Sequence, residues 1–294
     1  MCGIIGYIGE LHAASGGTGE ETTDSDQPAS VGDIVHTGLK NLEYRGYDSA
    51  GVALVGAESG LTVAKRSGEV DALTLPDVPD ATLGVGHTRW STHGPPTDAN
   101  AHPHTDCVGD VAVVHNGIVE NYEALKDELS NHEFTSDTDT EVIPHLIEEE
   151  LAADPDADLL GAVRRVEDRL EGSYAICAVR EGDDRIVVAR RGSPLVLGRG
   201  EDAAFVASDV TAFLEHTRDV TYLEDGDVAA LSAEGAELYA DAELVDRGVE
   251  TATSAADAAE QGGCDRYRRN ATHEQPPALR QAIAGRPHAH GRER

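Results

Sequence analysis

Apolar residues fall in many short runs along the chain, and most of these runs have the length and composition of β-strands. The first run, CGIIGYIG at 2–9, is apolar almost throughout and predicts a buried strand close to the amino terminus. Alternating apolar and polar positions predict short strands elsewhere. They are expected at 50–56, 61–66, 82–88, 110–115, 173–180, 185–190, 195–198, 203–207, 219–223, 227–231 and 235–239.

A second pattern, with apolar residues three or four positions apart, predicts helices. One helix is expected from Asp33, as its cap, to about Leu42. The others are expected at 121–132, from the capping-box pattern TDTE at 138–141 to about Leu151, and at 156–170. The predicted elements come in the order strands, then helices, then strands, and this order argues against regular βαβ alternation. They predict an α+β fold with mixed layers.

Two stretches lack this periodicity. Residues 11–30 are rich in Gly, Ser, Thr and acidic side chains, which predicts a solvated loop inserted after the first strand. From about residue 250 the sequence consists mainly of small and polar residues, and its last residues show no apolar periodicity. We therefore expect one globular domain over 2–245, followed over 246–294 by a linker remnant and a disordered tail.

The net charge of the chain restricts the classes of molecule that it can bind. The 294 residues include 55 Asp and Glu against 23 Lys and Arg, a net charge of −32, which disfavours binding to nucleic acid phosphates. An acidic surface suits either a basic partner or solubility in concentrated salt, and the near-absence of lysine resembles proteins of salt-loving archaea. No apolar run approaches the roughly 20 residues of a membrane helix, and no signal peptide is apparent, so we expect a cytoplasmic protein without a membrane partner.

Cys2 is the first candidate for chemistry. The four cysteines form no CxxC pair, and Cys177 lies in an apolar run typical of a core position. Removal of Met1 gives Cys2 a free α-amine with a pKa of about 7.7–8.0, which can take the proton of its own thiol. The thiolate is the nucleophilic form. The simpler alternative is a buried cysteine that only happens to follow the start codon.

Three more positions carry suitable chemistry, each with a plainer alternative. Arg89, in HTRWSTHG at 87–94, offers a planar fork for a carboxylate, or else a surface salt bridge. Asn116 and Gly117 could both donate to a developing oxyanion, or else form an Asn-Gly turn. Asp139 could hold a substrate ammonium group, or else cap a helix.

Together these motifs resemble one family, the class II glutamine amidotransferases, from residue 2 to about 245. The matching segments are CGIIGYIG at 2–9, LEYRGYDSAG at 42–51, HTRWSTHG at 87–94, NAHPH at 100–104, VVHNGIVENY at 113–122, SDTDTEV at 136–142 and RRGSPLVLG at 190–198. Within the family, LEYRGYDSAG, HTRWSTHG and TDTE favour the branch whose ammonia makes glucosamine 6-phosphate, rather than phosphoribosylamine, glutamate or asparagine.

The resemblance implies an N-terminal-nucleophile hydrolase fold, a four-layer αββα sandwich in which two mostly antiparallel sheets pack face to face. It implies that Cys2 is the nucleophile and that Asn116 and Gly117 form the oxyanion hole. Cys2 would attack the side-chain amide of glutamine, release ammonia, and leave a γ-glutamyl thioester for hydrolysis to glutamate.

The resemblance also assigns the residues that bind L-glutamine. Arg89 matches the residue for the α-carboxylate and Asp139 the residue for the α-amine. Trp90, Thr92 and His93 match the loop that closes over the substrate. No cofactor is implied. No metal is expected either, because the histidines at 87, 93, 102, 104 and 115 fall in motifs that are metal-free in the family.

In this branch of the family, sugar-phosphate isomerase domains follow and receive the ammonia. THEQPPALRQAIAGR at 272–286 resembles the start of that part, and no such domain follows it here. We therefore expect either a truncated gene product or a stand-alone subunit that works with a separate sugar-phosphate isomerase subunit. The alternatives are an ammonia donor for a different acceptor, and a catalytically idle glutamine-binding domain.

Overall fold

A computed structural model of the chain describes residues 2–9, 29–91, 93–154 and 156–252. The predicted insertion at 11–30 lies outside the described residues except for its last two, and the predicted linker and tail lie outside them from residue 253. The structure places β15 beyond residue 245, where it pairs with β11.

Fifteen strands are present among the described residues. They are β1 (Gly3–Gly9), β2 (Ser49–Gly56), β3 (Gly60–Ser67), β4 (Ala81–Arg89), β5 (His104–Thr105), β6 (Val111–Val119), β7 (Gly172–Arg180), β8 (Ile186–Arg191), β9 (Val196–Arg199), β10 (Ala203–Ala207), β11 (Asp219–Tyr222), β12 (Asp227–Ser232), β13 (Gly235–Ala240), β14 (Glu243–Leu244) and β15 (Glu250–Thr251). Every strand predicted from the pattern is among them. The short strands β5, β14 and β15 were not predicted, because two residues carry no detectable alternation.

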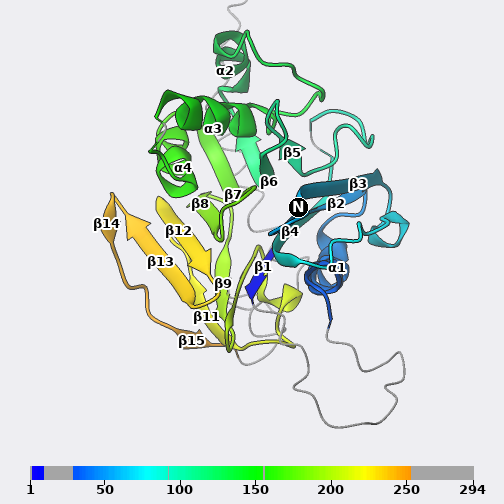
Figure 1. Cartoon of the computed structure of the whole chain (residues 1–294), viewed down its shortest axis with the longest axis vertical. Helices are drawn as coiled ribbons and strands as arrows, with labels where there is room; N and C mark the ends of the chain where they lie inside the picture. The colour runs from blue at the N-terminus through cyan, green and yellow to red at the C-terminus, as the bar shows by residue number, and fades with distance from the viewer. Residues whose placement is uncertain (1, 10–28, 92, 155, 253–294) are drawn as a thin grey trace, which may run out of the picture. The chain divides into compact units, whose positions relative to one another are not determined.

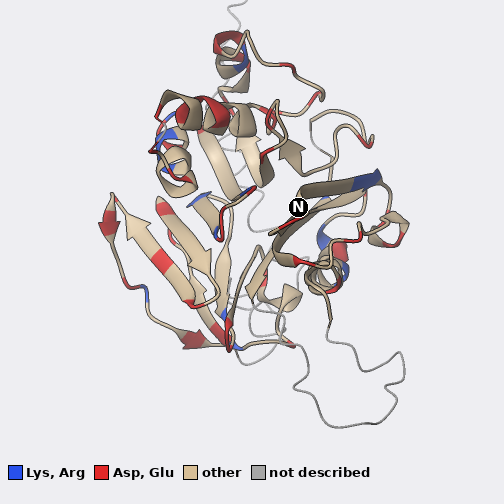
Figure 2. Ribbon diagram, in the orientation of Figure 1, with Lys and Arg blue, Asp and Glu red and all other residues tan. Residues whose placement is uncertain are grey.

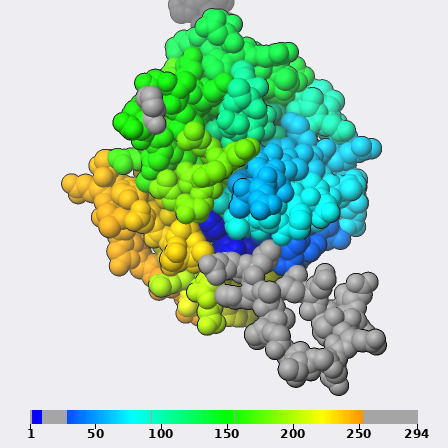
Figure 3. Space-filling view, in the orientation of Figure 1, coloured from blue at the N-terminus to red at the C-terminus, as the bar shows by residue number. Residues whose placement is uncertain are grey.

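The strands form two antiparallel sheets (Figure 1). The first has the order β15-β11-β9-β10-β1-β4-β2-β3, and the second has the order β14-β13-β12-β8-β7-β6-β5. The amino-terminal strand β1 lies inside the first sheet, between β10 and β4. Only a small dark-blue patch of it is visible in the space-filling view (Figure 3).

Four helices lie among the described residues, three of them on the outer faces of the two sheets and one against a neighbouring helix. They are α1 (Val31–Leu42), α2 (Tyr122–Glu128), α3 (Val142–Ala153) and α4 (Leu159–Glu167), and short 3-10 turns lie at Glu43–Arg45, Val70–Ala72 and Val210–Ala212. Helix α1 packs on β4 and β1, while α3 and α4 pack on the second sheet. The fold is therefore the predicted α+β sandwich of four layers, αββα.

Side chains alternate between the two faces of each strand in the second sheet, so this sheet separates two hydrophobic cores. On β7, Tyr174 and Ile176 face the layer of α2, α3 and α4, whereas Ala175 and Cys177 face the first sheet. Successive side chains of a strand point to opposite faces, so a strand covered on both sides is apolar throughout. Cys177 is thus the core residue that was predicted.

Several predicted helix bounds differ in detail from the structure. Helix α2 ends at Glu128 rather than at 132, and α4 spans Leu159–Glu167, within the predicted 156–170, with Asp158 as its cap. Ser30, not Asp33, is the cap of α1: its hydroxyl accepts from the Asp33 N–H at 3.1 Å, and the Asp33 carboxylate accepts from the Ser30 N–H at 3.0 Å. This reciprocal pair is a capping box one turn earlier than expected.

The capping box predicted at 138–141 is wrong. Helix α3 begins after Glu141 without a side-chain cap. The Glu141 carboxylate instead accepts hydrogen bonds from the backbone and hydroxyl groups of Thr135 and Ser136. The Thr138 hydroxyl is bonded to the His104 ring at 3.0 Å. The side chains that would have capped the helix therefore hold neighbouring segments together.

Acidic side chains lie on the helices, the loops and the outer strands, and they far outnumber the basic ones (Figure 2). Among the described residues, no helix has the length and apolar character needed to cross a membrane.

Candidate active site

Cys2 lies immediately before β1, beside the end of β4. Gly3 pairs with Thr88 on β4, and a side chain at position 3 would approach the Thr88 hydroxyl to 2.6 Å. A glycine there lets the two strands come close enough for the Trp90 N–H to donate to the Cys2 sulfur at 3.2 Å. The sequence order Cys-Gly is therefore part of how the thiol is placed.

The surroundings of the thiol act on its pKa in opposite directions. Burial raises the pKa of Cys2, while the hydrogen bond from the Trp90 N–H and the positive charges of Arg89 and Arg45 lower it. Burial prevails, so the pKa of the Cys2 thiol lies above its usual value. A base close to the sulfur is needed to form the thiolate.

Asn116 connects Cys2 to a buried histidine. Its side-chain nitrogen donates to the Cys2 carbonyl at 3.1 Å, and its side-chain oxygen lies 3.0 Å from Nε2 of His87. The same Nε2 also lies 3.0 Å from the His115 carbonyl. Because both of its partners are acceptors, Nε2 must carry the proton, and this fixes the Asn116 amide with its NH₂ toward Cys2.

Gly117 follows in the middle of a strand and not in a turn. Strand β6 runs on to Val119, and Asn116 and Gly117 pair with Ala175 and Tyr174 of β7. The plainer reading as an Asn-Gly turn is therefore excluded. Gly117 has φ +133°, and a side chain there would lie 1.9 Å from the Ser173 carbonyl oxygen. Only glycine fits this position.

Arg89 ends β4 and is buried. Its guanidinium donates to the main-chain carbonyls of His93, Gly94 and Pro95, the last two at 3.3 Å. Within the described residues it makes no salt bridge, which was the plainer alternative. A planar fork that holds carbonyl oxygens can hold a carboxylate in their place, and the segment after β4 occupies that fork here.

The loop after β4 lies beside the thiol, since Trp90 and His93 line the same cavity as Cys2. Trp90 is 46% exposed, and its ring lies edge-on to Tyr47 at 5.7 Å. His93 lines the same cavity as Cys2, and its Nδ1 is buried with no hydrogen-bond partner among the described residues. Thr92 lies outside the described residues. The Ser91 N–H donates to the Asp48 carboxylate at 2.8 Å. This bond ties the loop to the segment between the 3-10 turn at Glu43–Arg45 and β2.

Asp139 is buried and bridges to β6. Its carboxylate accepts from the Val119 N–H at 2.8 Å, so it does not cap α3. Cys2, Arg89, His93, Gly117 and Asp139 all line one small cavity of 20 Å³. The structure thus brings the predicted nucleophile and the predicted substrate-binding residues together. Asn116 lies at the edge of the group, bonded to the Cys2 carbonyl.

Sequence reasoning missed several residues of this site. Arg45 donates to the Cys2 carbonyl at 3.1 Å and pairs with Asp209 at 3.3 Å. His102 stacks on His87 with ring centroids 4.1 Å apart. His115 lies 2.8 Å from the Thr140 hydroxyl. All but Asp209 fall in or beside the segments that carry the family resemblance, which was the only available signal for their roles.

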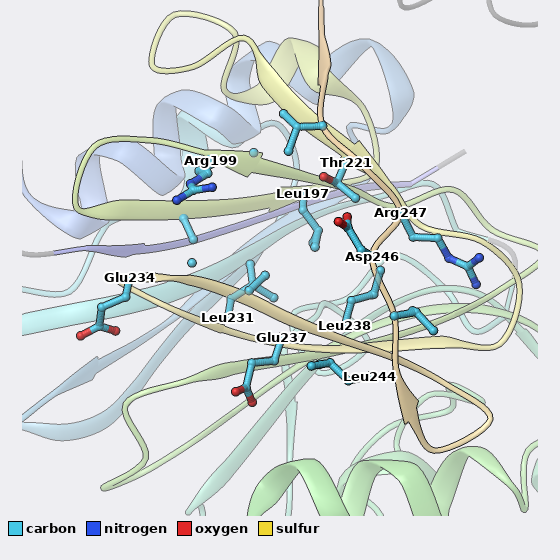
Figure 4. A pocket seen from close by; sticks show the side chains of 16 residues that line it. Leu197, Arg199, Thr221, Leu231, Glu234, Glu237, Leu238, Leu244, Asp246 and Arg247 are labelled. Carbon is cyan, nitrogen blue, oxygen red and sulfur yellow. The ribbon is translucent and has the colours of Figure 1, made fainter.

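A larger cavity, of 390 Å³, opens elsewhere between β9, β11 and the β12–β14 strands (Figure 4). Leucines line much of it, with Glu234, Glu237 and Arg247 at its edges. No cysteine, no serine and none of the predicted site residues is among the described residues that line it. Its size alone therefore does not make it the reaction centre.

Comparison with known proteins agrees with this geometry. The family described as "Glutamine amidotransferase domain" matches residues 87–215. The chain is 56% identical, over 287 residues, to a protein of Halobacterium salinarum named glutamine–fructose-6-phosphate aminotransferase (isomerizing). The alignment covers 97% of this chain and 44% of that protein.

This chain belongs to the glutamine amidotransferases.

Other relatives of the same name support the assignment. The Streptomyces coelicolor protein is 46% identical over 294 residues, again with 97% of this amidotransferase chain and 44% of the relative covered. The chain thus spans less than half the length of the curated relatives it matches.

Solved structures are similar in fold as well. The glutamine phosphoribosylpyrophosphate amidotransferase of B. subtilis, complexed with ADP and GMP, superposes with a TM-score of 0.64 at 25% identity. The match covers 81% of this amidotransferase chain and 49% of that one. A structure titled as the allosteric regulatory enzyme of purine biosynthesis has a TM-score of 0.63 at 26% identity. These neighbours support the N-terminal-nucleophile sandwich.

Proposed function

We propose that this chain hydrolyses the side-chain amide of glutamine, with Cys2 as the nucleophile. The observation that carries the proposal is the shared cavity in which the Cys2 thiol lies with Arg89 and Asp139. A thiol, a cation and an anion in one cavity suit the amide, the α-carboxylate and the α-ammonium group of a free amino acid. The glutamine amidotransferase match adds the identity of that amino acid.

The first step needs a base for the Cys2 proton. Since burial raises the pKa of the thiol, we assign the base to the α-amine that removal of Met1 leaves on Cys2 itself. The amine takes the thiol proton, and the sulfur attacks the carboxamide carbon to form a tetrahedral oxyanion. When the C–N bond breaks, the proton leaves with the nitrogen as ammonia.

Asn116 and Gly117 then serve the oxyanion. The Asn116 NH₂ already faces Cys2, held there by the proton of His87, so it needs little reorganisation to donate to charge that develops beside the sulfur. The Gly117 N–H is the second donor in this proposal. Water hydrolyses the γ-glutamyl thioester that remains, and glutamate leaves with the thiol restored.

Substrate entry requires the loop after β4 to move. The cavity of 20 Å³ has room for about one water molecule, and carbonyls of 93–95 occupy the Arg89 fork. We propose that the glutamine α-carboxylate replaces these carbonyls on Arg89, while Asp139 receives the α-ammonium group. Trp90, Thr92 and His93 then close over the bound substrate.

We further propose that the ammonia serves the synthesis of an amino sugar, glucosamine 6-phosphate, on a sugar-phosphate isomerase part outside this chain. The support is the name shared by the relatives, of which this chain covers 44%. The net charge of −32 and the similarity to a Halobacterium protein support work in the cytoplasm at high salt.

The decisive experiment measures glutamate release by the purified chain in concentrated salt, with Cys2→Ala as the blank. Intact mass establishes in the same sample whether Met1 has been removed. Glutamate formation above the blank is expected. Equal rates for wild type and Cys2→Ala leave only a glutamine-binding role. Addition of fructose 6-phosphate, with and without a sugar-phosphate isomerase subunit, then tests whether the acceptor is the sugar or another molecule.

A further inference from the structure

A second group of reactive side chains lies apart from Cys2, where the loop before β6 meets α3. Cys107 belongs to the β5–β6 loop, His132 follows α2, and His145 and Glu148 lie one turn apart on α3 (Figure 1). Each contributes one potential ligand atom, and these four atoms lie within 4.8 Å of one another. No other such group of His, Cys, Asp and Glu occurs in the described part of the chain.

Four of the six distances between these atoms are close to those of a coordination shell, and none of the six exceeds 4.8 Å. The Cys107 sulfur lies 3.4 Å from Nδ1 of His132 and 3.6 Å from Nδ1 of His145. The Glu148 carboxylate oxygen lies 3.1 Å from the first of these nitrogens and 3.6 Å from the second. Zinc bonds of about 2.3 Å to sulfur and about 2.0–2.1 Å to nitrogen and oxygen give tetrahedral edges of about 3.6 Å and about 3.3 Å. The observed distances lie close to both values.

Hydrogen bonds can account for only two of these four contacts at a time, one at each Nδ1. Each Nδ1 has a single in-plane position, which holds either a proton or a lone pair. It can therefore serve one partner well, yet each Nδ1 faces both the Cys107 sulfur and the Glu148 oxygen. One cation at the centre engages all four lone pairs at once. Convergence on a common point is thus better explained by a metal than by proton sharing.

The surroundings orient the four groups and leave a way in. The Cys107 N–H donates to the same Glu148 oxygen at 3.1 Å. Nε2 of His132 lies 3.5 Å from the Glu149 carboxylate, the kind of partner that commonly orients a ligating imidazole. The side chain of His145 is 1% exposed and that of His132 is 10% exposed. Cys107 is exposed, so an ion can reach the group from solvent.

We propose that Cys107, His132, His145 and Glu148 bind one zinc ion in tetrahedral geometry. The donor set of one thiolate, two imidazoles and one carboxylate suits zinc rather than calcium or magnesium, which prefer oxygen. The Cys107 thiol loses its proton to solvent on binding. With four protein ligands and no open position, the site is structural. It fastens the β5–β6 loop and the end of α2 to α3.

This site also bears on the cavity around Cys2. Helix α3 follows directly on Thr138, Asp139 and Thr140, which line that cavity. An ion that anchors α3 therefore steadies the segment that carries Asp139. The earlier expectation of no metal rested on the histidines at 87, 93, 102, 104 and 115. None of these belongs to the group proposed here.

The test uses the whole chain in high salt, stripped of metal and kept reduced by a phosphine. One equivalent of Zn²⁺ should bind and raise the melting temperature. Co²⁺ in its place should give the sulfur-to-cobalt charge-transfer band and the intense visible bands of a tetrahedral thiolate site. Loss of one outer-shell partner weakens a metal site by about 10–100-fold, so removal of the ligand in Cys107→Ser should weaken binding by at least about 100-fold.

Three further variants make the result specific. His132→Gln should lose the zinc-dependent rise in melting temperature, whereas His36→Gln, a half-buried histidine on α1, should keep it. Cys2→Ser should keep both the cobalt band and the zinc affinity. The proposal is overturned by a stripped chain that binds no zinc, or by a thiolate band that persists in Cys107→Ser and vanishes in Cys2→Ser. Neither result depends on whether the chain splits glutamine.

Discussion

Asn116→Ala is the sharpest test of the mechanism, because the Asn116 amide both contacts the Cys2 backbone and is the proposed oxyanion donor. Its nitrogen donates to the Cys2 carbonyl at 3.1 Å, and its oxygen accepts from His87 at 3.0 Å. Alanine removes both contacts without adding bulk. The His87 proton keeps the His115 carbonyl as its partner at 3.0 Å, so the substitution leaves that buried donor satisfied.

The backbone contact and the proposed oxyanion role predict effects of different size. Loss of a typical hydrogen bond such as the one to the Cys2 carbonyl costs about 1 kcal/mol of folding free energy. Loss of an oxyanion donor costs about 3–4 kcal/mol of transition-state stabilisation, or roughly 10²–10³ in kcat. The variant should therefore fold with a modestly lower melting temperature and split glutamine at least about a hundredfold more slowly. Its KM for glutamine should change little.

The assay is glutamate release at saturating glutamine, with thermal unfolding measured on the same samples. Asn121→Ala is the matched control, since its side chain also has partners at both ends, Arg169 and Glu171, but lies away from Cys2. That control should lose stability and keep its kcat. If Asn116→Ala turns over glutamine at a near-normal rate, Asn116 has no part in the oxyanion hole.

Three other outcomes are expected. Gly117→Ala should have a lower melting temperature and lose most glutamine turnover, since its methyl group meets the Ser173 carbonyl oxygen at 1.9 Å. Gly182 also has positive φ but no atom within 4 Å of the place that a methyl group would take, so Gly182→Ala should remain active. Equal stability and turnover of the two variants contradict the clash. Asp139→Asn keeps an acceptor for the Val119 N–H but loses the negative charge. A hydrogen bond to a charged group contributes about 1.5–3 kcal/mol, so its loss should raise the KM for glutamine roughly 10–100-fold. An unchanged KM shows that Asp139 does not bind the α-amine. Burial lowers the pKa of His87 to about 3, below its unfolded value, so its contribution to stability is present above about pH 6.5 and is lost as the pH falls. His87 alone should cost about 2 kcal/mol of unfolding free energy between pH 7 and pH 5. The buried histidines at 102, 104, 115 and 145, whose pKa values are also lowered, add to that loss. Denaturant titration should therefore show a loss of at least about 2 kcal/mol, and equal stability at both pH values refutes neutral buried imidazoles.

Much of the fold follows from local pattern. The alternation of apolar residues located the long strands, and the resemblance of seven segments supplied both the four-layer sandwich and the predicted site. Helix starts were less accurate, because a Ser or Thr followed by a carboxylate has more than one possible partner. At Ser30 the partners are local, whereas at Glu141 they are hydroxyl and backbone groups of Thr135 and Ser136.

The sequence by itself determined which residues could do chemistry and in which kind of fold, since periodicity and motif text are local properties. Only the tertiary structure decided what those residues touch. It placed Asn116 and Gly117 within a strand, filled the Arg89 fork with carbonyls of its own loop, and joined Asp139 to the Val119 N–H. It also brought Cys107, His132 and Glu148 together. Their contact depends on how three segments pack on one sheet, and no spacing along the chain encodes that distance.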